Sequence, residues 1–181
     1  MKPIIISLSG SARHGKGESC NIIERKLKSI NKKCLQINNA DYLKFVHAMY
    51  LGGSKEKMFE HTPENRTGWQ LLGTEKVRSK NPSFWVDTII RLLNVIGEDF
   101  DYVLISDTRF PNEIQRFKDE KYHIIPIHVE RLNFDNGLTE EQKNHLSETA
   151  LNDYEFDYYL EAKNLNELEC EISSKLGFLF K

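Results

Sequence analysis

The chain has 181 residues, the length of one ordinary domain, and its 25 basic and 27 acidic side chains give a net charge of −2. This balance gives no general attraction to nucleic acid, and no run approaches the roughly 18 uninterrupted apolar residues of a membrane span. We therefore expect a single domain over 1–181, with no membrane attachment and no stable nucleic-acid binding. Homodimerisation is left open.

Strand-like and helix-like patterns alternate along the chain. The apolar run at 3–9 lacks alternation, which favours a parallel strand buried on both faces. The predicted strands are 3–9, 33–38, 101–107, 122–130 and 156–161, and the predicted helices are 16–31, most of 41–97, 111–121 and a last one from 165. This alternation predicts an α/β fold in three layers, a parallel sheet flanked by helices, with ligands beyond the carboxyl ends of the strands.

A glycine-rich turn joins the first predicted strand to the first predicted helix. Its residues GSARHGK, 10 to 16, match the phosphate-loop pattern G-x-x-x-x-G-K in the context that the pattern requires. The glycines let backbone N–H groups curl around phosphate oxygens, and Lys16 can reach the outer phosphates. We interpret this turn as a nucleotide phosphate-binding loop rather than a chance turn.

The position after the lysine is unusual. Gly17 stands where such loops place a serine or threonine for magnesium, which weakens the interpretation as a GTPase or motor ATPase. The G-K-G sequence resembles the loop of adenylate kinases, in which phosphates and water hold the metal. Ser19 is a candidate to supply the missing hydroxyl two positions further on. The loop alone favours a small-molecule kinase.

A second motif follows the buried strand at 101–107. Asp107 stands at the end of this strand, where the second acid of a phosphate-loop enzyme is expected to hold the water shell of a metal ion. Arg109, two residues later, offers a planar fork to a phosphate. Both motifs are therefore expected at one edge of the sheet.

Four segments together resemble a known family: LSGSARHGKG, GWQLLGTEKVRSKNPSFWVD, VLISDTRFPNE and HLSETALNDYEFDYYL. They occur in the same order as in bacteriophage-type deoxynucleoside monophosphate kinases, and the last is also similar to phosphomevalonate kinase. The resemblance covers nearly the whole chain. It implies ATP-dependent transfer of a phosphoryl group to a nucleoside 5′-monophosphate, with Mg²⁺.

The resemblance also implies roles by position. It puts Gln70, Arg78 and Trp85 in the acceptor pocket, Asp107 and Arg109 beside the transferred phosphoryl group, and Arg131 at the start of a lid. It puts the ATP phosphates on the loop and the first helical turn: Gly10, Ser11, Ala12, Arg13, His14, Gly15, Lys16, Gly17, Glu18 and Ser19. One departure concerns the metal, because the family usually has G-K-D-T where this chain has Gly17 and Glu18.

The residue types on the acceptor side, within about 41–97, fit this assignment. Arg66 and Gln70 are four apart and share one helix face, where a glutamine amide suits a base edge. Arg78 suits a phosphate, and Trp69 and Trp85 offer flat surfaces for stacking. The alternative is that both tryptophans belong to the hydrophobic core and that Arg66 is a solvated charge.

A polar segment at about 131–147 is the candidate lid. A kinase has to exclude water from its nucleotide, and Arg131 could spread charge off the transferring phosphoryl group. The alternative is an ordinary loop after a strand. The cysteines at 20, 34 and 170 form no CxxC pair, which favours reduced thiols and a cytoplasmic location.

The sequence thus predicts a phosphotransferase, a nucleoside or deoxynucleoside monophosphate kinase that uses ATP and Mg²⁺, with Lys16, Asp107, Arg109 and Arg131 as catalytic residues. Two alternatives remain. One is a kinase of another small phosphorylated acceptor or of a modified base in DNA. The other is a nucleotide-binding module without turnover, suggested by the unusual GKGES.

Overall fold

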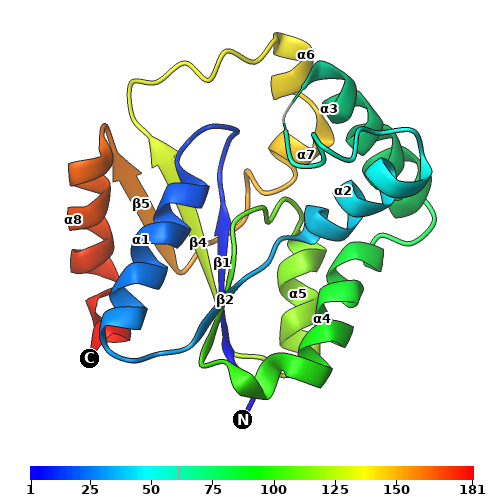
Figure 1. The fold of residues 1–181 in the computed structure, drawn as a ribbon. Helices are drawn as coiled ribbons and strands as arrows, with labels where there is room; N and C mark the ends of the chain where they lie inside the picture. Colours follow the sequence, from blue (N-terminus) through cyan, green and yellow to red (C-terminus); the bar gives the residue numbers. More distant parts are fainter. Residues whose placement is uncertain (61) are drawn as a thin grey trace.

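The structure of the protein is a computed structural model, in which residues 1–60 and 62–181 are described. Its centre is a five-stranded parallel sheet in the order β2-β3-β1-β4-β5. The strands are β1 (Ile4–Ser9), β2 (Cys34–Gln36), β3 (Tyr102–Ile105), β4 (Ile124–Arg131) and β5 (Tyr158–Ala162). Helices lie on both sides of this sheet in Figure 1, so the predicted three-layer α/β fold is confirmed.

The helices follow the predicted order, with differences at their ends. The α-helices are α1 (Lys16–Ser29), α2 (Asn39–Tyr50), α3 (Pro63–Gln70), α4 (Phe84–Ile96), α5 (Pro111–Asp119), α6 (Glu140–Lys143), α7 (Leu146–Thr149) and α8 (Leu165–Lys175). A π-helix, η1 (Leu71–Arg78), continues α3, and short 3₁₀ turns lie at η2 (Gly97–Asp99) and η3 (Gly177–Phe180). None of the helices in these two ranges combines the length and the apolar character that crossing a bilayer requires.

Two apolar layers hold the sheet. On one face α1 and α8 pack on the strands through side chains such as Leu27 and Ile172, which are completely buried. On the other face α4 and α5 contribute Val86 and Phe117. The central strands β1 and β3 are buried on both faces, and their sequences are continuous apolar runs without alternation, as the run at 3–9 predicts.

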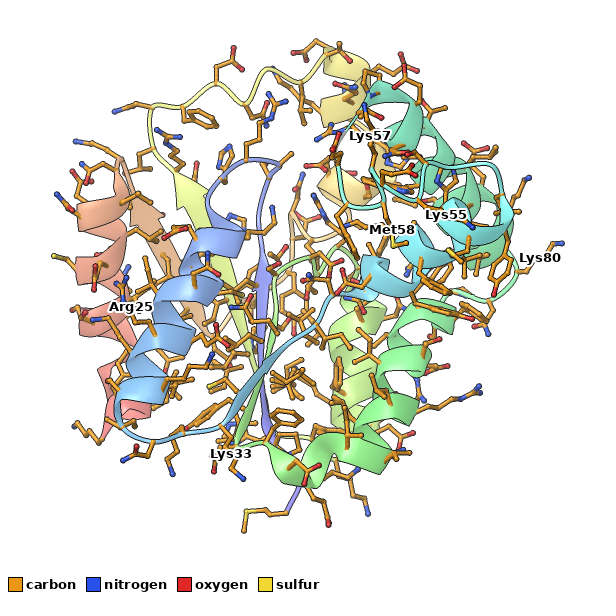
Figure 2. The ribbon with its side chains drawn as sticks, in the orientation of Figure 1. Arg25, Lys33, Lys55, Lys57, Met58 and Lys80 are labelled. Carbon is orange, nitrogen blue, oxygen red and sulfur yellow. The ribbon has the colours of Figure 1, made fainter. Side chains whose placement is uncertain are left out.

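The helical region between β2 and β3 has a small core of its own. Leu43 of α2, Leu72 of η1 and Trp85 of α4 pack together there. In Figure 1 α2 and α3 lie beyond one end of the sheet, and the segment between β4 and α6 passes over the same end toward α3. The exposed side chains labelled in Figure 2, such as Arg25, Lys33 and Lys80, lie on separate parts of the surface.

The register of the sheet brings the predicted motifs together. Ser7 of β1 pairs with Ile105 of β3, so the glycine-rich turn and Asp107 leave the same edge from neighbouring strands. The order of the strands therefore positions the candidate site at the carboxyl ends of β1 and β3, as expected for an open parallel sheet.

Candidate functional site

The glycine-rich turn has the backbone of an anion-binding loop. Gly10 has a φ of 136°, and a Cβ atom there would collide with the carbonyl oxygen of Val129 on β4. Gly15 caps α1 with a φ of 94°, in the left-handed region that favours glycine. The two glycines thus allow the turn to curl closely against β4 before α1 begins, with the N-terminus of α1 facing the turn.

Lys16 is held inside this turn. Its side chain is 9% exposed, and its Nζ donates to the carbonyl oxygens of Gly10 and Ser11, each at 2.8 Å. Burial, assisted by the nearby Arg109, lowers the pKa of Lys16 to about 7. An incoming phosphate would offer this amine stronger acceptors than the two carbonyl groups.

Three residues of the first turn of α1 lie where a hydroxyl ligand of magnesium was expected, and they differ in exposure and in hydrogen bonding. Gly17 is exposed, and a Cβ atom there would meet nothing within 4 Å. Glu18 accepts a hydrogen bond from Asn21 at 3.3 Å. The Ser19 side chain is fully buried and donates to Gly15 O at 3.0 Å, so the structure does not bring this hydroxyl to the open side of the loop.

Asp107 ties the sheet edge to the helical region. One carboxylate oxygen accepts from the backbone N–H of Asn39 at 2.9 Å, and the other accepts from the N–H of Ala40 at 2.9 Å. The aspartate therefore satisfies donors of the first turn of α2. Burial raises the pKa of the Asp107 carboxyl, although these backbone hydrogen bonds oppose the shift.

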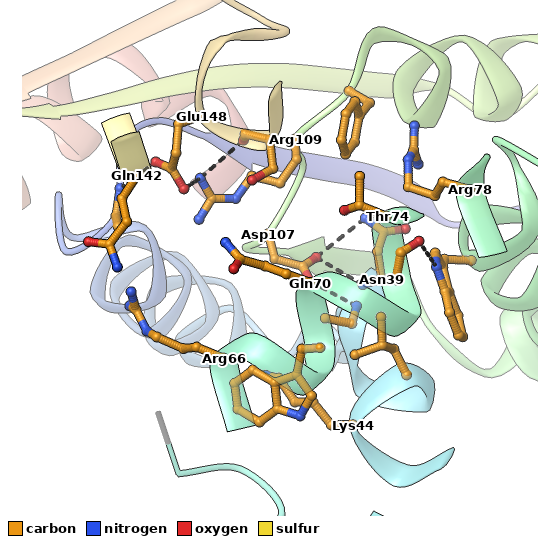
Figure 3. Close-up of a pocket in the computed structure, with 18 of the residues that line it drawn as sticks. Asn39, Lys44, Arg66, Gln70, Thr74, Arg78, Asp107, Arg109, Gln142 and Glu148 are labelled. Atoms are coloured by element: carbon orange, nitrogen blue, oxygen red, sulfur yellow. Dashed lines mark hydrogen bonds and ion pairs between the residues drawn. The ribbon is translucent and has the colours of Figure 1, made fainter. Parts of the chain in front are cut away.

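A large cavity of about 560 Å³ opens beside the loop. Figure 3 shows that its labelled side chains come from α2, α3, η1, the end of β3 and the segment after β4. Nine of the predicted site residues line this cavity: Ala12, Arg13, Arg66, Trp69, Gln70, Arg78, Trp85, Asp107 and Arg109. The structure thus brings together the predicted acceptor residues and the motif after β3.

Two of its arginines already have carboxylate partners. Arg78 pairs with Glu113 at 3.2 Å, and its guanidinium lies 3.5 Å from the centre of the Phe110 ring. Arg109 pairs with Glu148 at 2.6 Å. Burial raises the pKa of Glu113 to about 7. Both guanidinium groups are therefore oriented before any ligand arrives, and both are partly neutralised.

The two tryptophans differ in their surroundings. Trp85 is 5% exposed and its Nε1 donates to Gly73 O at 3.2 Å, so it belongs to the small core as well as to the cavity wall. Trp69 is half-buried, and Lys44 Nζ lies 5.2 Å from its ring centre. Of the two rings, Trp69 is the one with surface available to a ligand.

A smaller cavity of about 260 Å³ lies on the other side of the loop. Arg13, His14 and Gly15 form one wall, and Asn164 and Leu165 at the start of α8 form another. Arg131 lines this cavity rather than the large one, and its guanidinium lies 4.2 Å from the centre of the Phe134 ring. The structure therefore separates Arg131 from Asp107 and Arg109.

His14 connects the loop to the end of β4. Its Nδ1 accepts the backbone N–H of Arg131 at 3.1 Å, and its ring meets Phe134 edge to face. Burial and the neighbouring Lys16 lower the pKa of His14, which favours the neutral ring that this hydrogen bond requires. His14 thus has a defined structural role in the loop.

The predicted lid crosses the loop and reaches the large cavity. Arg13 Nη1 donates to Asn136 O at 3.0 Å, and Gln142 of α6 lines the large cavity opposite Arg66 of α3 (Figure 3). The segment also forms two short helices, α6 and α7, that the polar sequence did not predict. Their capping groups, Thr139 and His145, lie within a run of polar residues that has no helical periodicity to mark it.

Several cavity residues were missed by the sequence reasoning. These residues are far apart in the sequence, and the fold brings them together at the large cavity. They are Asn39, Lys44, Glu113, Gln142 and Glu148. Glu113 and Glu148 do lie inside the recognised segments VLISDTRFPNE and HLSE. Each of these two segments thus contains an acidic residue to which the sequence analysis gave no role, and this was the available sign that it belongs to the site.

Comparison with known proteins supports the fold. No protein-family model and no curated protein matches the chain. Among solved structures, the Cys556Ala mutant of Mycobacterium tuberculosis APS kinase CysC matches with a TM-score of 0.53 and 9% identity, over 97% of this chain and 98% of that one. The same enzyme in complex with AMPPNP and APS matches with a TM-score of 0.55 and 11% identity, over the same shares. These likenesses show that the chain has the fold of a phosphate-loop kinase.

Proposed function

We propose that the protein is an ATP-dependent phosphotransferase that acts on a nucleoside or deoxynucleoside 5′-monophosphate. The observation that carries this proposal is the position of the phosphate loop between two cavities, with Arg13 lining both. A loop that binds a triphosphate in this position has a pocket for the donor on one side and a pocket for the acceptor on the other.

The loop fits a triphosphate. Its turn needs Gly10 and Gly15, α1 begins directly after it at Lys16, and the Lys16 amine is held against the turn. The smaller cavity beside His14 and Leu165 would take the adenine. ATP, when bound, supplies the γ-phosphoryl group that is transferred.

Asp107 after β3 and Asn39 at the start of α2 fit a hydrated Mg²⁺ ion. Asn39 Oδ1 is buried without a hydrogen-bond partner in the described structure, while Asn39 Nδ2 donates to Asp107 at 3.3 Å. A carboxylate and an unpaired amide oxygen are hard oxygen ligands of the kind that Mg²⁺ prefers. Asp107 and Asn39 would thus hold the water shell, and Gly17 would leave the remaining positions to phosphate and water.

The chain then contributes charge and exclusion of water. Arg109 lies close enough to Lys16 for its positive charge to lower the pKa of the Lys16 amine. Together they would stabilise the charge that spreads over the phosphoryl oxygens in the transition state. The lid segment, held to the loop by Arg13 and Asn136, would keep water from the nucleotide.

The large cavity suits a nucleotide acceptor. Gln70 and Arg66 offer hydrogen bonds to a base edge, Trp69 offers a ring face, and Arg78 lies deeper, beside Phe110. A volume of about 560 Å³ is in the range of pockets that bury a ligand of this size. The resemblance in four segments to bacteriophage-type kinases favours deoxynucleotides.

A second acceptor class is favoured by one comparison. One matched structure is a complex of APS kinase with AMPPNP and APS, so this fold also holds other acceptors. We keep a different small phosphorylated acceptor as the alternative.

A coupled assay of ADP release tests both candidates. The common ribonucleoside and deoxyribonucleoside monophosphates, and APS, would each be supplied with ATP and Mg²⁺. We expect stoichiometric diphosphate formation with at least one deoxynucleotide. Turnover with APS alone would replace the nucleotide assignment, and ATP binding without turnover on any acceptor would identify a non-catalytic binding module.

A further inference from the structure

Glu148 joins two parts of the candidate site. Its Oε1 accepts from Arg109 Nη1 at 2.6 Å, and its Oε2 accepts the backbone N–H of Ala12 in the phosphate loop at 3.2 Å. The side chain is only 14% exposed, and Figure 3 shows it next to Arg109, joined to it by this ion pair. One carboxylate therefore bridges the loop and the arginine that follows β3.

The surrounding residues fix this carboxylate in place. His145 caps α7, and its Nδ1 accepts the N–H of Ser147 at 3.2 Å and lies 2.8 Å from the Ser147 hydroxyl oxygen. Ser147 O in turn accepts from Arg109 at 3.4 Å. The motif HLSE is thus one structural unit whose last residue is directed at the loop.

The two donors that Glu148 occupies are of the kind that bind phosphate oxygens. A loop N–H and a guanidinium are anion-binding groups, and the carboxylate also lies close enough to Lys16 to raise its pKa. Glu148 is therefore an internal anion within the site. A bound phosphate must share these donors with it or displace it.

On the basis of the proposed phosphotransfer, we infer that Glu148 is a positioning residue that couples the lid to the phosphate loop. It orients Arg109 and closes the segment after β4 while the site is empty. The same negative charge opposes phosphate binding. Glu148 thus lowers the affinity for the nucleotide and raises the rate of transfer.

Substitution by glutamine separates these effects from a general loss of structure. A carboxylate has two acceptor oxygens, whereas an amide has one oxygen and an NH₂ donor. Glu148→Gln keeps the size of the side chain, removes its charge and must break one of its two links. Glu148→Asp keeps the charge but is one methylene shorter, so it weakens the bridge alone.

The test measures binding and turnover separately. Calorimetry would give the Kd of a non-hydrolysable ATP analogue and of pyrophosphate, and the ADP-release assay would give kcat with the preferred acceptor. For Glu148→Gln we expect binding at least about threefold tighter, because one repulsive charge is gone. We expect kcat at least about tenfold lower, because Arg109 is no longer oriented.

The control is Glu141→Gln, which removes the same charge from an exposed position on α6 of the same segment. It should change neither quantity. For Glu148→Asp we expect unchanged affinity with a lower kcat. Weaker binding in Glu148→Gln, or values equal to those of the unsubstituted protein, would overturn the inference. Binding of the ATP analogue needs no acceptor. If the proposed acceptor is wrong, the Kd measured for the ATP analogue therefore still tests the inference.

Discussion

The phosphate loop and the large cavity beside it are built in different ways. The loop consists of neighbours in the sequence, from Gly10 to Lys16, and its shape follows from two glycines and a helix start. The cavity takes its lining from segments as far apart as Ala12 and Glu148. A local motif forms the first, whereas the order of the strands and the packing of α2, α3 and η1 form the second.

The two regions also differ in how their cations are held. Lys16 donates to two carbonyl groups of the loop, which a phosphate can replace at little cost. Arg78 and Arg109 each pair with a carboxylate, Glu113 and Glu148 respectively. A ligand in the cavity therefore has to compete with internal anions, and selectivity for the acceptor can arise from that competition.

The largest effect is expected from Lys16→Ala. Because Lys16 supplies the amine that the loop holds near the transferred phosphoryl group, its loss should lower kcat at least ~100-fold, or about 2.7 kcal/mol. The melting temperature should stay close to the original value, since the hydrogen bonds of the amine go to two carbonyl groups of the loop itself. Near-normal turnover in a pure preparation would contradict the phosphate-loop assignment.

Asp107→Asn should come next, because Asp107 lines the large cavity and also holds the first turn of α2. The amide would face the N–H groups of Asn39 and Ala40, so we expect a loss of about 2 kcal/mol in the free energy of unfolding. We also expect a higher Mg²⁺ requirement and a kcat at least about tenfold lower. Chemical denaturation and a magnesium titration measure these changes.

The matched comparison is Ser19→Ala. Its hydroxyl donates within α1 and is fully buried, so its removal should leave the magnesium requirement unchanged. If Ser19→Ala and Asp107→Asn were equally defective in magnesium titrations, Ser19 would supply the magnesium ligand that Gly17 lacks.

The sequence was sufficient for the fold and for the loop. Apolar runs without alternation mark strands buried on both faces, and the turn between Ser9 and Lys16 has a sequence pattern of its own. Asp107 and Arg109 could also be selected, because the end of a parallel strand is where a ligand-binding residue is expected.

The sequence was not sufficient for the partners of these residues. Nothing in the local pattern indicates that Glu113 pairs with Arg78 or that Glu148 reaches the loop, because these contacts depend on how distant segments pack. Arg131 illustrates the same limit. Its place in the chain predicts a lid arginine, whereas its side chain lines the smaller cavity and lies against the Phe134 ring.

A smaller effect is expected from the protonation of Lys16. Its pKa of about 7 lies far below the ordinary value of 10.5, so the amine is largely neutral in the empty site above pH 8. Bound phosphates favour the charged form and raise this pKa. Binding of an ATP analogue should therefore take up a proton above pH 7, and its affinity should fall as the pH rises from 7 toward 10.

Calorimetry at pH 8 in two buffers with different ionisation enthalpies measures this proton uptake. Lys16→Arg is the matched control, since a guanidinium stays charged over the whole range and should abolish the uptake while it keeps the cation. Equal uptake in Lys16→Arg would assign the proton to another group, such as His14.

The smallest effect is expected in the tryptophan fluorescence. It distinguishes Trp69, on the wall of the large cavity, from Trp85, which belongs to the small hydrophobic core. Trp85 is 5% exposed and hydrogen-bonded to Gly73, whereas Trp69 is half-buried beneath Lys44. A base that stacks on a ring, or a phosphate that draws Lys44 away, should therefore change the emission of Trp69. We expect the preferred monophosphate to change the fluorescence by a few tens of percent without ATP. Trp69→Phe should remove most of this change, and Trp85→Phe should preserve it.

An ATP analogue alone should change the emission less, because its phosphates contact the loop rather than α3. A large response to the ATP analogue with none to any monophosphate would contradict the assignment of the acceptor to the large cavity. It would also contradict the roles proposed for Arg66, Gln70 and Arg78.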